Sequence, residues 1–359
     1  MIFDKKTTCI LPWITMARNI DKSNLGMVGP CCLYQQKKYF TYDYNEFWKS
    51  DELEEVCNKM IKGERPEQCI KCWKDEDAGL TSMRQSVNQS RLEPHIDRIG
   101  KPRDSFKVSE VSLLAGATCN LGCRMCQSHV SHGVHHVWQT IGRDTDTPTI
   151  YDDQAELLLK NNIDHIKYLT IEGGEPFYNN RIKVLLKWLV DNKHASHITL
   201  YVTTNATIMN EAIMENLKGF KEVVIIVGLD AVGEKHSYIR PNADWNKINE
   251  NIDLLRDNGL NVIVMYSVSV LNIIHLPELV EWCKSRKLHM TQGSTVLDPV
   301  EIHPRNLPKS LRHMVDDRWK GHLAEPTHDC IPFIKQLDGY WKTKIYNYMP
   351  EWKQEYERV

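Results

Sequence analysis

An alternation of β-branched runs and amphipathic stretches begins near Ser105, and it restricts the fold more than any other feature of the chain. The β-branched runs predict strands at residues 108–115, 166–172, 198–204, 223–230, 262–270 and 290–297. Periodic apolar positions between them predict helices at residues 151–161, 180–191, 208–217, 245–258 and 276–286. This order predicts an α/β fold with a parallel sheet, flat or rolled into a barrel, and an active site at the carboxyl ends of the strands.

The same alternation divides the 359-residue chain into three expected domains. Residues 1–104 are rich in cysteine and broken by turns, and the polar stretch RIGKPRDS separates them from an α/β domain at residues 105–300. Residues 301–359 carry several prolines among aromatic and basic positions and predict a helical extension. A hydrophobic content of 42% is enough to fill a core, so the chain is expected to fold rather than remain disordered.

Charge and hydropathy give no support to several classes of protein. The formal net charge is −2 and no long block of lysine or arginine occurs, so nothing favours binding to duplex nucleic acid. The N-terminus lacks the apolar stretch of a signal peptide, and no run of about 18 apolar residues suggests a membrane span. We therefore expect a cytoplasmic protein. In that compartment eleven cysteines, an odd number, favour metal binding over a disulfide framework.

Three cysteines follow the first predicted strand in the sequence CNLGCRMC, at Cys119, Cys123 and Cys126. Cysteine thiolates are the usual iron–sulfur ligands, and a cubane cluster has four irons, so three cysteines leave one iron open to an exogenous ligand. Zinc is the alternative, with a fourth ligand drawn from the nearby histidines His129, His132, His135 and His136. In the absence of zinc, these histidines either face the mouth of the site or form a solvated or capping face.

Two further motifs follow the next predicted strands: GGEP at residues 173–176 and TTNAT at residues 203–207. Together with CNLGCRMC, they resemble the radical S-adenosylmethionine (SAM) superfamily over roughly residues 105–300. The resemblance implies a partial (β/α)6 barrel in which the amino and carboxylate groups of SAM chelate the open iron of a [4Fe-4S] cluster. It also implies reductive cleavage of SAM to a 5′-deoxyadenosyl radical that abstracts a substrate hydrogen. The electron would come from a donor such as flavodoxin or ferredoxin.

The resemblance implies that eight residues contact SAM, namely Met125, Gly173, Gly174, Glu175, Thr204, Asn205, Asp230 and Arg240. The two glycines would let the backbone approach the methionine moiety, and Arg240 would pair with its carboxylate. Met125 takes a position beside the adenine where the family usually has an aromatic residue, and Gly228 stands where the family often has serine. Read without the resemblance, the same residues are equally typical of a tight turn, helix caps and a surface ion pair.

A second set of cysteines in the N-terminal segment comprises Cys9, Cys31, Cys69 and Cys72. A CxxC with two distant cysteines predicts a four-thiolate site for zinc or an iron–sulfur cluster. These motifs are similar to the twitch or SPASM segment, which holds an auxiliary [4Fe-4S] cluster, and the spacing from Gly26 favours Cys31 over Cys32 as the ligand. That segment usually follows the barrel, whereas here it precedes it. Four ligands leave no open iron, which favours electron transfer or substrate support.

Three cysteines lie outside these motifs. Cys57 and Cys283 fall in helical patterns and are expected in the core, whereas Cys330 is either a core residue or one with a role near a cluster.

We thus expect an enzyme with two [4Fe-4S] clusters and SAM that oxidises, epimerises or cross-links a peptide or protein side chain. The alternatives are a radical SAM dehydrogenase or epimerase of a small molecule, such as a carbohydrate or nucleotide, and a non-catalytic zinc-binding adaptor.

Overall fold

The computed structural model describes residues 4–18, 27–36, 41–77, 79 and 81–358. Contacts divide the chain into two compact units. Unit 1 comprises Met1–Leu114, Tyr151–Ile171 and Lys193–Leu200, and unit 2 comprises Ala115–Ile150, Glu172–Asn192 and Tyr201–Val359. The division differs from the expected domains 1–104, 105–300 and 301–359, because unit 1 takes strands from the α/β region and unit 2 includes the C-terminal residues.

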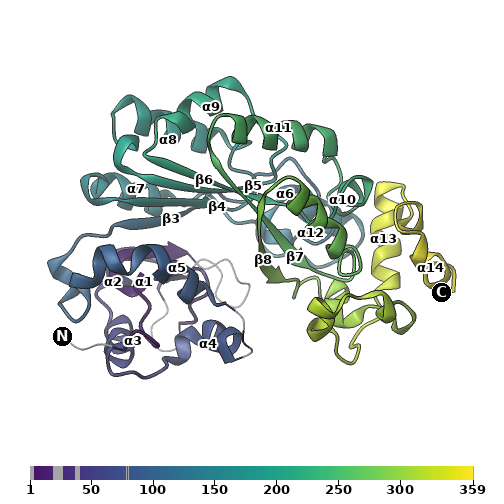
Figure 1. Ribbon diagram of the computed structural model, residues 1–359, viewed down its shortest axis with the longest axis horizontal. Helices are drawn as coiled ribbons and strands as arrows, with labels where there is room; N and C mark the ends of the chain where they lie inside the picture. Colours follow the sequence, from purple (N-terminus) through teal and green to yellow (C-terminus); the bar gives the residue numbers. More distant parts are fainter. Residues whose placement is uncertain (1–3, 19–26, 37–40, 78, 80, 359) are drawn as a thin grey trace. The chain divides into compact units, whose positions relative to one another are not determined.

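Unit 1 combines short N-terminal helices with a strand assembly (Figure 1). Its elements are α1 (Leu11–Ile14), β1 (Thr15–Arg18), β2 (Val28–Gly29), α2 (Tyr44–Trp48), α3 (Asp51–Ile61), α4 (Ile70–Asp77), α5 (Met83–Arg91), β3 (Glu110–Leu114), α7 (Asp153–Asn161) and most of β4 (Tyr168–Glu172). The strand order is β2-β1-β3-β4. Strand β1 pairs antiparallel with β2 and parallel with β3, with Thr15 opposite Glu110.

The pairing of β1 with β3 was not predicted from the sequence. The β1 sequence TMAR is only four residues long and directly follows the helical LPWI, so it is too short for a recognisable alternation. The N-terminal segment therefore extends the sheet as well as carrying cysteines. The Arg91 guanidinium lies 2.7 Å from the Glu110 carboxylate on β3, and both side chains are buried, which anchors α5 to the same strand.

Unit 2 contains the remaining strands and the helices that cover them. Its elements are the last four residues of β5 (Thr199–Thr204), β6 (Glu222–Gly228), β7 (Asn261–Val268), β8 (His289–Thr295), α6 (His132–Thr140), α8 (Asn180–Asp191), α9 (Glu211–Lys218), α10 (Glu234–Ile239), α11 (Trp245–Asp257), α12 (Leu276–Ser285), α13 (Ile331–Trp341) and α14 (Lys353–Arg358). The strand order is β5-β6-β7-β8, and β7 runs parallel to both β6 and β8.

The six strands and five helices predicted for the α/β region are confirmed as β3 to β8, α7, α8, α9, α11 and α12. The local sequence explains the elements of unit 2. Burial alternates along β7, and α8 buries one stripe, formed by Ile182, Leu185 and Leu189. Asn210 and Asp244 cap α9 and α11 by accepting backbone N–H groups. Figure 1 shows α8, α9 and α11 along one side of the strands.

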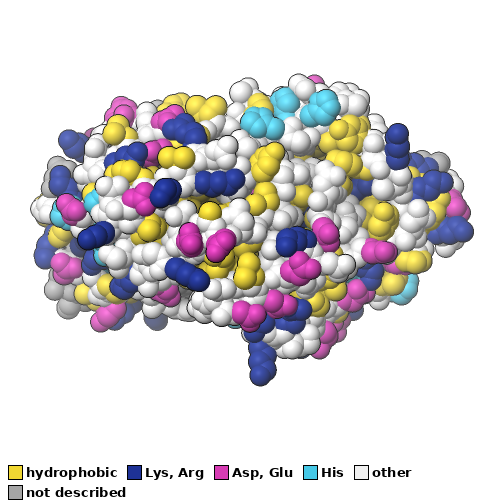
Figure 2. Space-filling view, turned by 90° about the horizontal axis from the view of Figure 1, so that it is seen from above, with side chains coloured by type: hydrophobic (Ala, Val, Ile, Leu, Met, Phe, Trp, Pro, Cys, Tyr) yellow, Lys and Arg dark blue, Asp and Glu magenta, His cyan; other side chains and the backbone are white. Residues whose placement is uncertain are grey.

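Residues 301–358 contain short 3-10 turns together with α13 and α14. On the face shown in Figure 2, basic and acidic side chains are interspersed, as the small net charge suggests. Among the described helices, none is both long and apolar enough to cross a membrane.

Candidate active site

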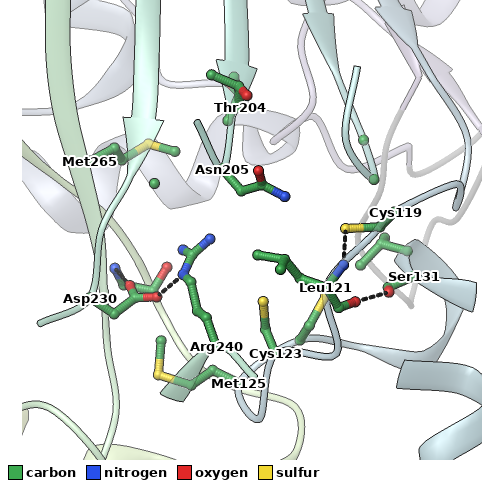
Figure 3. A pocket seen from close by; sticks show the side chains of 17 residues that line it. Cys119, Leu121, Cys123, Met125, Ser131, Thr204, Asn205, Asp230, Arg240 and Met265 are labelled. Atoms are coloured by element: carbon green, nitrogen blue, oxygen red, sulfur yellow. Dashed lines mark hydrogen bonds and ion pairs between the residues drawn. The ribbon is translucent and has the colours of Figure 1, made fainter. Parts of the chain in front are cut away.

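A cavity of about 230 Å³ lies in unit 2, where polar residues follow the carboxyl ends of the strands (Figure 3). Small-molecule pockets usually measure roughly 300–1,000 Å³, so this cavity lies below the usual range. Its lining includes ten of the sequence-predicted residues, which are Cys119, Cys123, Met125, Cys126, Gly173, Gly174, Thr204, Asn205, Asp230 and Arg240. The sequence motifs therefore converge on one cavity, as the parallel strand order predicts.

The three cysteines of the loop after β3 expose their thiols to this cavity, and Figure 3 shows Cys119 and Cys123 pointing into it. Burial raises the pKa of all three thiols, that of Cys126 to about 12. The thiols are therefore protonated at neutral pH, and binding of a metal or cluster releases their protons. The backbone N–H of Leu121 donates to the Cys119 sulfur at 3.5 Å.

Side-chain amides connect this cysteine loop to the end of β5. The Asn205 side-chain N–H donates to the Asn120 side-chain oxygen at 3.0 Å, and the Asn120 side-chain N–H donates to the Thr207 hydroxyl at 2.8 Å. The Thr207 hydroxyl donates in turn to the Asn205 side-chain oxygen at 2.6 Å. This closed network fixes the residues around Cys119 against the TTNAT segment. Asn120 was not predicted as a site residue, although it lies within the cysteine motif.

The two glycines after β4 serve the protein backbone as well as lining the cavity. Gly173 has φ +119°, a conformation that other residues rarely adopt. A Cβ atom on Gly174 would lie 2.3 Å from the Thr118 carbonyl oxygen. The N–H of Gly174 donates to the Gly116 carbonyl at 2.8 Å, and the N–H of Glu175 donates to the Thr118 carbonyl at 2.8 Å. The GGEP turn therefore docks on the segment that leads into Cys119.

Glu175 supports the residues that line the cavity. The described lining does not include Glu175, whose side chain is fully buried. Its carboxylate accepts hydrogen bonds from the Thr204 hydroxyl at 2.7 Å, the Asn205 N–H at 2.7 Å and the Phe177 N–H at 3.0 Å. Burial raises the pKa of Glu175, and these donors oppose the shift. The structure thus places Glu175 as a support for Thr204 and Asn205.

Asp230 holds Arg240 at the cavity. The Arg240 Nε donates to one Asp230 oxygen at 2.7 Å, and the Ser267 N–H donates to the other at 3.0 Å. Figure 3 shows the Arg240 guanidinium directed into the cavity beside Asp230. A Cβ atom on Gly228 would lie 2.9 Å from the Arg240 Nη2, so the glycine at this position leaves room for the arginine. The pair therefore presents a fixed positive charge to an anionic ligand group.

Replacing Asp230 with alanine is expected to lower the free energy of unfolding by about 3 kcal/mol, because it leaves a largely buried guanidinium without its partner. We take the lower end of the range for buried pairs because the Arg240 side chain keeps 18% exposure. The affinity for SAM, the ligand that the sequence resemblance implies, should fall at the same time. Urea denaturation and equilibrium dialysis measure the two effects. Asp316→Ala, in an exposed pair with Arg318, is the matched control and should cost much less, because solvent screens that pair.

Met125 is held by a chain of polar contacts that the sequence did not reveal. The Ser269 hydroxyl donates to the Met125 sulfur at 2.8 Å, and the Ser269 N–H donates to the Asn272 side-chain oxygen at 2.8 Å. The Asn272 amide donates to the Asp230 carbonyl at 3.1 Å. Ser269 and Asn272 are fully buried. Polar residues directly after a hydrophobic strand, as in VSVLN, are the signal that identifies such a network.

The histidine run lies beside the cavity rather than in its lining, as far as the described residues show. His129 is fully buried, with its Nδ1 3.9 Å from an Asp146 oxygen. His132 and His136 lie exposed on α6. A zinc site at the three cysteines would have to recruit Asp230 from the lining, and that carboxylate is already bound by Arg240 and Ser267.

A second thiol-lined cavity lies in unit 1, and its lining includes Cys9, Cys31, Cys69 and Cys72. Burial raises the pKa of all four thiols, that of Cys9 to about 12. The buried Arg84 also lines the cavity and pairs with Glu76 at 2.7 Å, so a positive charge stands beside the thiols. The described lining contains Cys31 and not Cys32, while Gly26 falls outside the described residues.

Within the described part of the chain, no group of three or more His, Cys, Asp or Glu side chains is arranged so that it could hold a metal ion.

The positions of Cys31 and Cys32 predict a clear difference between two variants. Cys31→Ala removes one of four thiols around the cavity, so any metal held by these thiols should be lost, because an incomplete thiolate set loses affinity. Cys32→Ala is the matched control and should retain the metal. Iron and zinc analysis of both proteins checks this expectation. Equal metal loss in the two variants would contradict the assignment of Cys31.

The cysteines outside both motifs are buried. Cys57 on α3 and Cys283 on α12 lie in the core as expected. Cys330 is also buried, at the start of α13, and burial raises its pKa to about 12.

An α/β fold whose strand ends surround a cavity with three cysteine thiols, a glycine turn and a fixed arginine is typical of enzymes that bind an iron–sulfur cluster and an anionic ligand. Residues 113–283 match the sequence family described as the Radical SAM superfamily, so the chain contains a radical SAM domain. The match covers the cysteine loop and every other residue that lines the cavity.

The sequence is also similar to that of the uncharacterized protein MJ0907 of Methanocaldococcus jannaschii, which is 29% identical over 173 residues. That alignment covers 46% of this chain and 54% of the relative, so the chain spans about half of the relative's length.

Solved structures with a similar fold include native anSMEcpe with bound AdoMet, at 18% identity and a TM-score of 0.42 over 52% of this chain and 53% of that one. Streptococcus suis SuiB bound to S-adenosylmethionine has 15% identity and a TM-score of 0.40 over 84% of this chain and 61% of that one.

The radical SAM family implies a [4Fe-4S] cluster and SAM, and the residues present fit both. Three thiols from one loop reach the cavity, which matches a cluster with one open iron. Arg240 offers a cation for a carboxylate, and Met125 offers a polarisable side chain in the same lining.

Proposed function

We propose that this protein is a radical SAM enzyme that cleaves SAM reductively and begins its reaction by abstracting a hydrogen from the substrate. The observation that carries the proposal is the convergence of the three cysteines, the glycine turn, Asp230 and Arg240 on one cavity. Cys119, Cys123 and Cys126 would hold a [4Fe-4S] cluster. That cluster, when bound with SAM, supplies the radical chemistry.

The protein's own contribution is to position the groups around the cavity. Asp230 orients Arg240 toward the cavity, where its charge would bind the SAM carboxylate. Glu175 fixes the Thr204 and Asn205 segment, and Asn205 in turn holds the cysteine loop through Asn120. Rigid support of this kind keeps a reactive group in one geometry relative to its substrate.

We also propose that the four thiols of unit 1 hold an auxiliary [4Fe-4S] cluster like that of the twitch or SPASM segment. Four cysteines around one cavity support this assignment, since a full thiolate set matches a cluster without an open iron. The role expected for it is electron transfer or substrate support. Flavodoxin or ferredoxin is the proposed electron donor.

A peptide or protein side chain remains our proposed substrate, with a carbohydrate or nucleotide as the alternative. Oxidation, epimerisation and cross-linking are the proposed outcomes. Incubation of the reduced enzyme with SAM and candidate substrates, followed by mass spectrometry, separates the substrate classes by which molecule changes mass.

Anaerobic purification with iron and zinc analysis tests the proposal. We expect about eight irons per chain, which corresponds to two [4Fe-4S] clusters. Addition of dithionite and SAM should then form 5′-deoxyadenosine. A protein with zinc in both sites that does not cleave SAM would be the zinc-binding adaptor, and the enzyme proposal would be wrong. A protein with about four irons and one zinc would retain the radical SAM site and refute only the auxiliary cluster.

A further inference from the structure

Arg124 lies inside the cysteine motif, between Cys123 and Met125, yet it is not among the described residues that line the cavity. Its side chain is only 1% exposed and forms an ion pair with Asp338, with Nη2 3.1 Å from an Asp338 oxygen. The same nitrogen donates to the Thr343 hydroxyl at 2.7 Å. The guanidinium carbon lies 4.0 Å from the centroid of the Tyr238 ring. A charged residue of the cluster loop is thus bound to the C-terminal segment.

Asp338, on α13, is the centre of this buried network. Besides Arg124, its carboxylate accepts hydrogen bonds from the Tyr238 hydroxyl at 3.1 Å, the Thr343 hydroxyl at 3.0 Å and the Ile345 N–H at 2.8 Å. Its side chain is 1% exposed. A carboxylate with this many donors is held rigidly, so it fixes the groups that bind to it.

Trp341 makes a second contact between α13 and the cluster loop. A Cβ atom on Gly122, the residue before Cys123, would lie 2.5 Å from the Trp341 ring. The indole therefore packs directly against the loop backbone, at a position where only glycine leaves room. Asp338 and Trp341 lie one turn apart on α13, so the end of one helix contacts both Gly122 and Arg124.

The network also reaches the residue that faces the SAM carboxylate in our proposal. The Arg124 N–H donates to the Ile239 carbonyl at 2.9 Å, and Arg124 Nε donates to the Tyr238 carbonyl at 2.7 Å. Tyr238 and Ile239 end α10, and Arg240 follows directly. Arg124 therefore joins the loop that carries the thiols to the segment that carries Arg240.

From these contacts we infer that Asp338 and Trp341 are positioning residues, through which the C-terminal segment sets the geometry of the cluster loop and of Arg240. Both lie outside residues 113–283, which match the family, so this support is an addition to the radical SAM domain. The inference rests on the proposed function, because the loop is positioned for the cluster and SAM. Supporting residues of this kind orient the groups that bind a metal or ligand and affect its affinity.

The test compares wild-type protein with two double variants, each of which removes one positive and one negative charge and so keeps the net charge of the protein. Arg124→Met with Asp338→Asn removes both buried charges while keeping a polar acceptor at position 338, so no buried charge is left unpaired. Arg143→Met with Glu301→Gln is the control, since that pair also joins the radical SAM domain to the C-terminal segment but, among the described residues, forms no hydrogen bond or ion pair with the cluster loop. Urea denaturation reports folding, and electron paramagnetic resonance of the dithionite-reduced protein with and without SAM reports the cluster.

We expect the Arg124/Asp338 variant to fold, to show an altered resonance spectrum in the presence of SAM and to bind SAM about 10-fold more weakly, a loss of about 1.4 kcal/mol. The control should match wild type in both respects. Trp341→Ala should shift the spectrum in the same way and Trp341→Phe should restore most of it, which gives a decision even if the double variant is insoluble. A folded Arg124/Asp338 variant with wild-type spectrum and affinity would overturn the inference. If wild type itself lacks a reducible cluster, the proposed function fails and the inference with it.

Discussion

Replacement of Cys123 with alanine is expected to abolish the reductive cleavage of SAM. Cys123 supplies one of three thiols at the cavity, and a cluster with two protein ligands is not retained. Iron content should fall by about half, to roughly four atoms per chain, because the thiols of unit 1 are untouched. Iron analysis and chromatographic detection of 5′-deoxyadenosine measure the two effects on the same preparation.

Cys283→Ala is the matched control for this experiment. Cys283 is a buried cysteine on α12 and lines neither thiol cavity as described. It should retain all of the iron and full cleavage, with only a modest loss of stability from the deleted sulfur. Cleavage of SAM by the Cys123 variant at the wild-type rate would show that the cysteine loop does not hold the reactive cluster.

Gly174→Ala should be the most damaging single methyl group that can be added to the site. The new Cβ atom would lie 2.3 Å from the Thr118 carbonyl oxygen, which belongs to the backbone and cannot rotate away. Overpacking of this kind costs about 1–3 kcal/mol or more, and here it pushes apart the GGEP turn and the segment leading into Cys119. We expect lower stability together with reduced iron retention in the radical SAM site, measured by urea denaturation and iron analysis.

Gly339→Ala adds the same methyl group at an exposed position on α13 where nothing lies within 4 Å. This variant should be as stable as wild type or more stable by up to about 1 kcal/mol, because alanine favours the helix interior. Equal stability of the Gly174 and Gly339 variants would mean that the turn and the cysteine segment separate easily, contrary to the close packing described above.

The strands and helices of the α/β region could be predicted because each has a long local signature. Strand β7, for example, alternates buried and partly exposed residues, and Asp244 precedes α11 as its capping residue. Strand β1 could not be predicted, because its four residues carry no pattern and its partner β3 lies far along the chain. Pairing between distant segments depends on tertiary packing, which local propensity does not encode.

The candidate site, like the fold, could be predicted only in part from the sequence. The motifs and the family resemblance identified ten of the described residues that line the cavity, since cysteine spacing and strand-end glycines are local features. They did not distinguish residues that line the cavity from residues that support the lining. Glu175 lies within GGEP, but its buried carboxylate accepts hydrogen bonds from Thr204 and Asn205. The ion pair of Arg124 with Asp338 was also missed, because an arginine beside a cysteine gives no sign of a partner in another part of the sequence.

Electron nuclear double resonance with isotopically labelled SAM tests most directly whether SAM binds at the cluster held by Cys119, Cys123 and Cys126. The protein is reduced with dithionite and mixed with SAM carrying ¹⁵N at the amino group or ¹⁷O at the carboxylate. We predict hyperfine coupling from both labels to the reduced cluster, and its loss in the Cys123→Ala variant. A reduced cluster whose spectrum shows no coupling to either label would contradict the account.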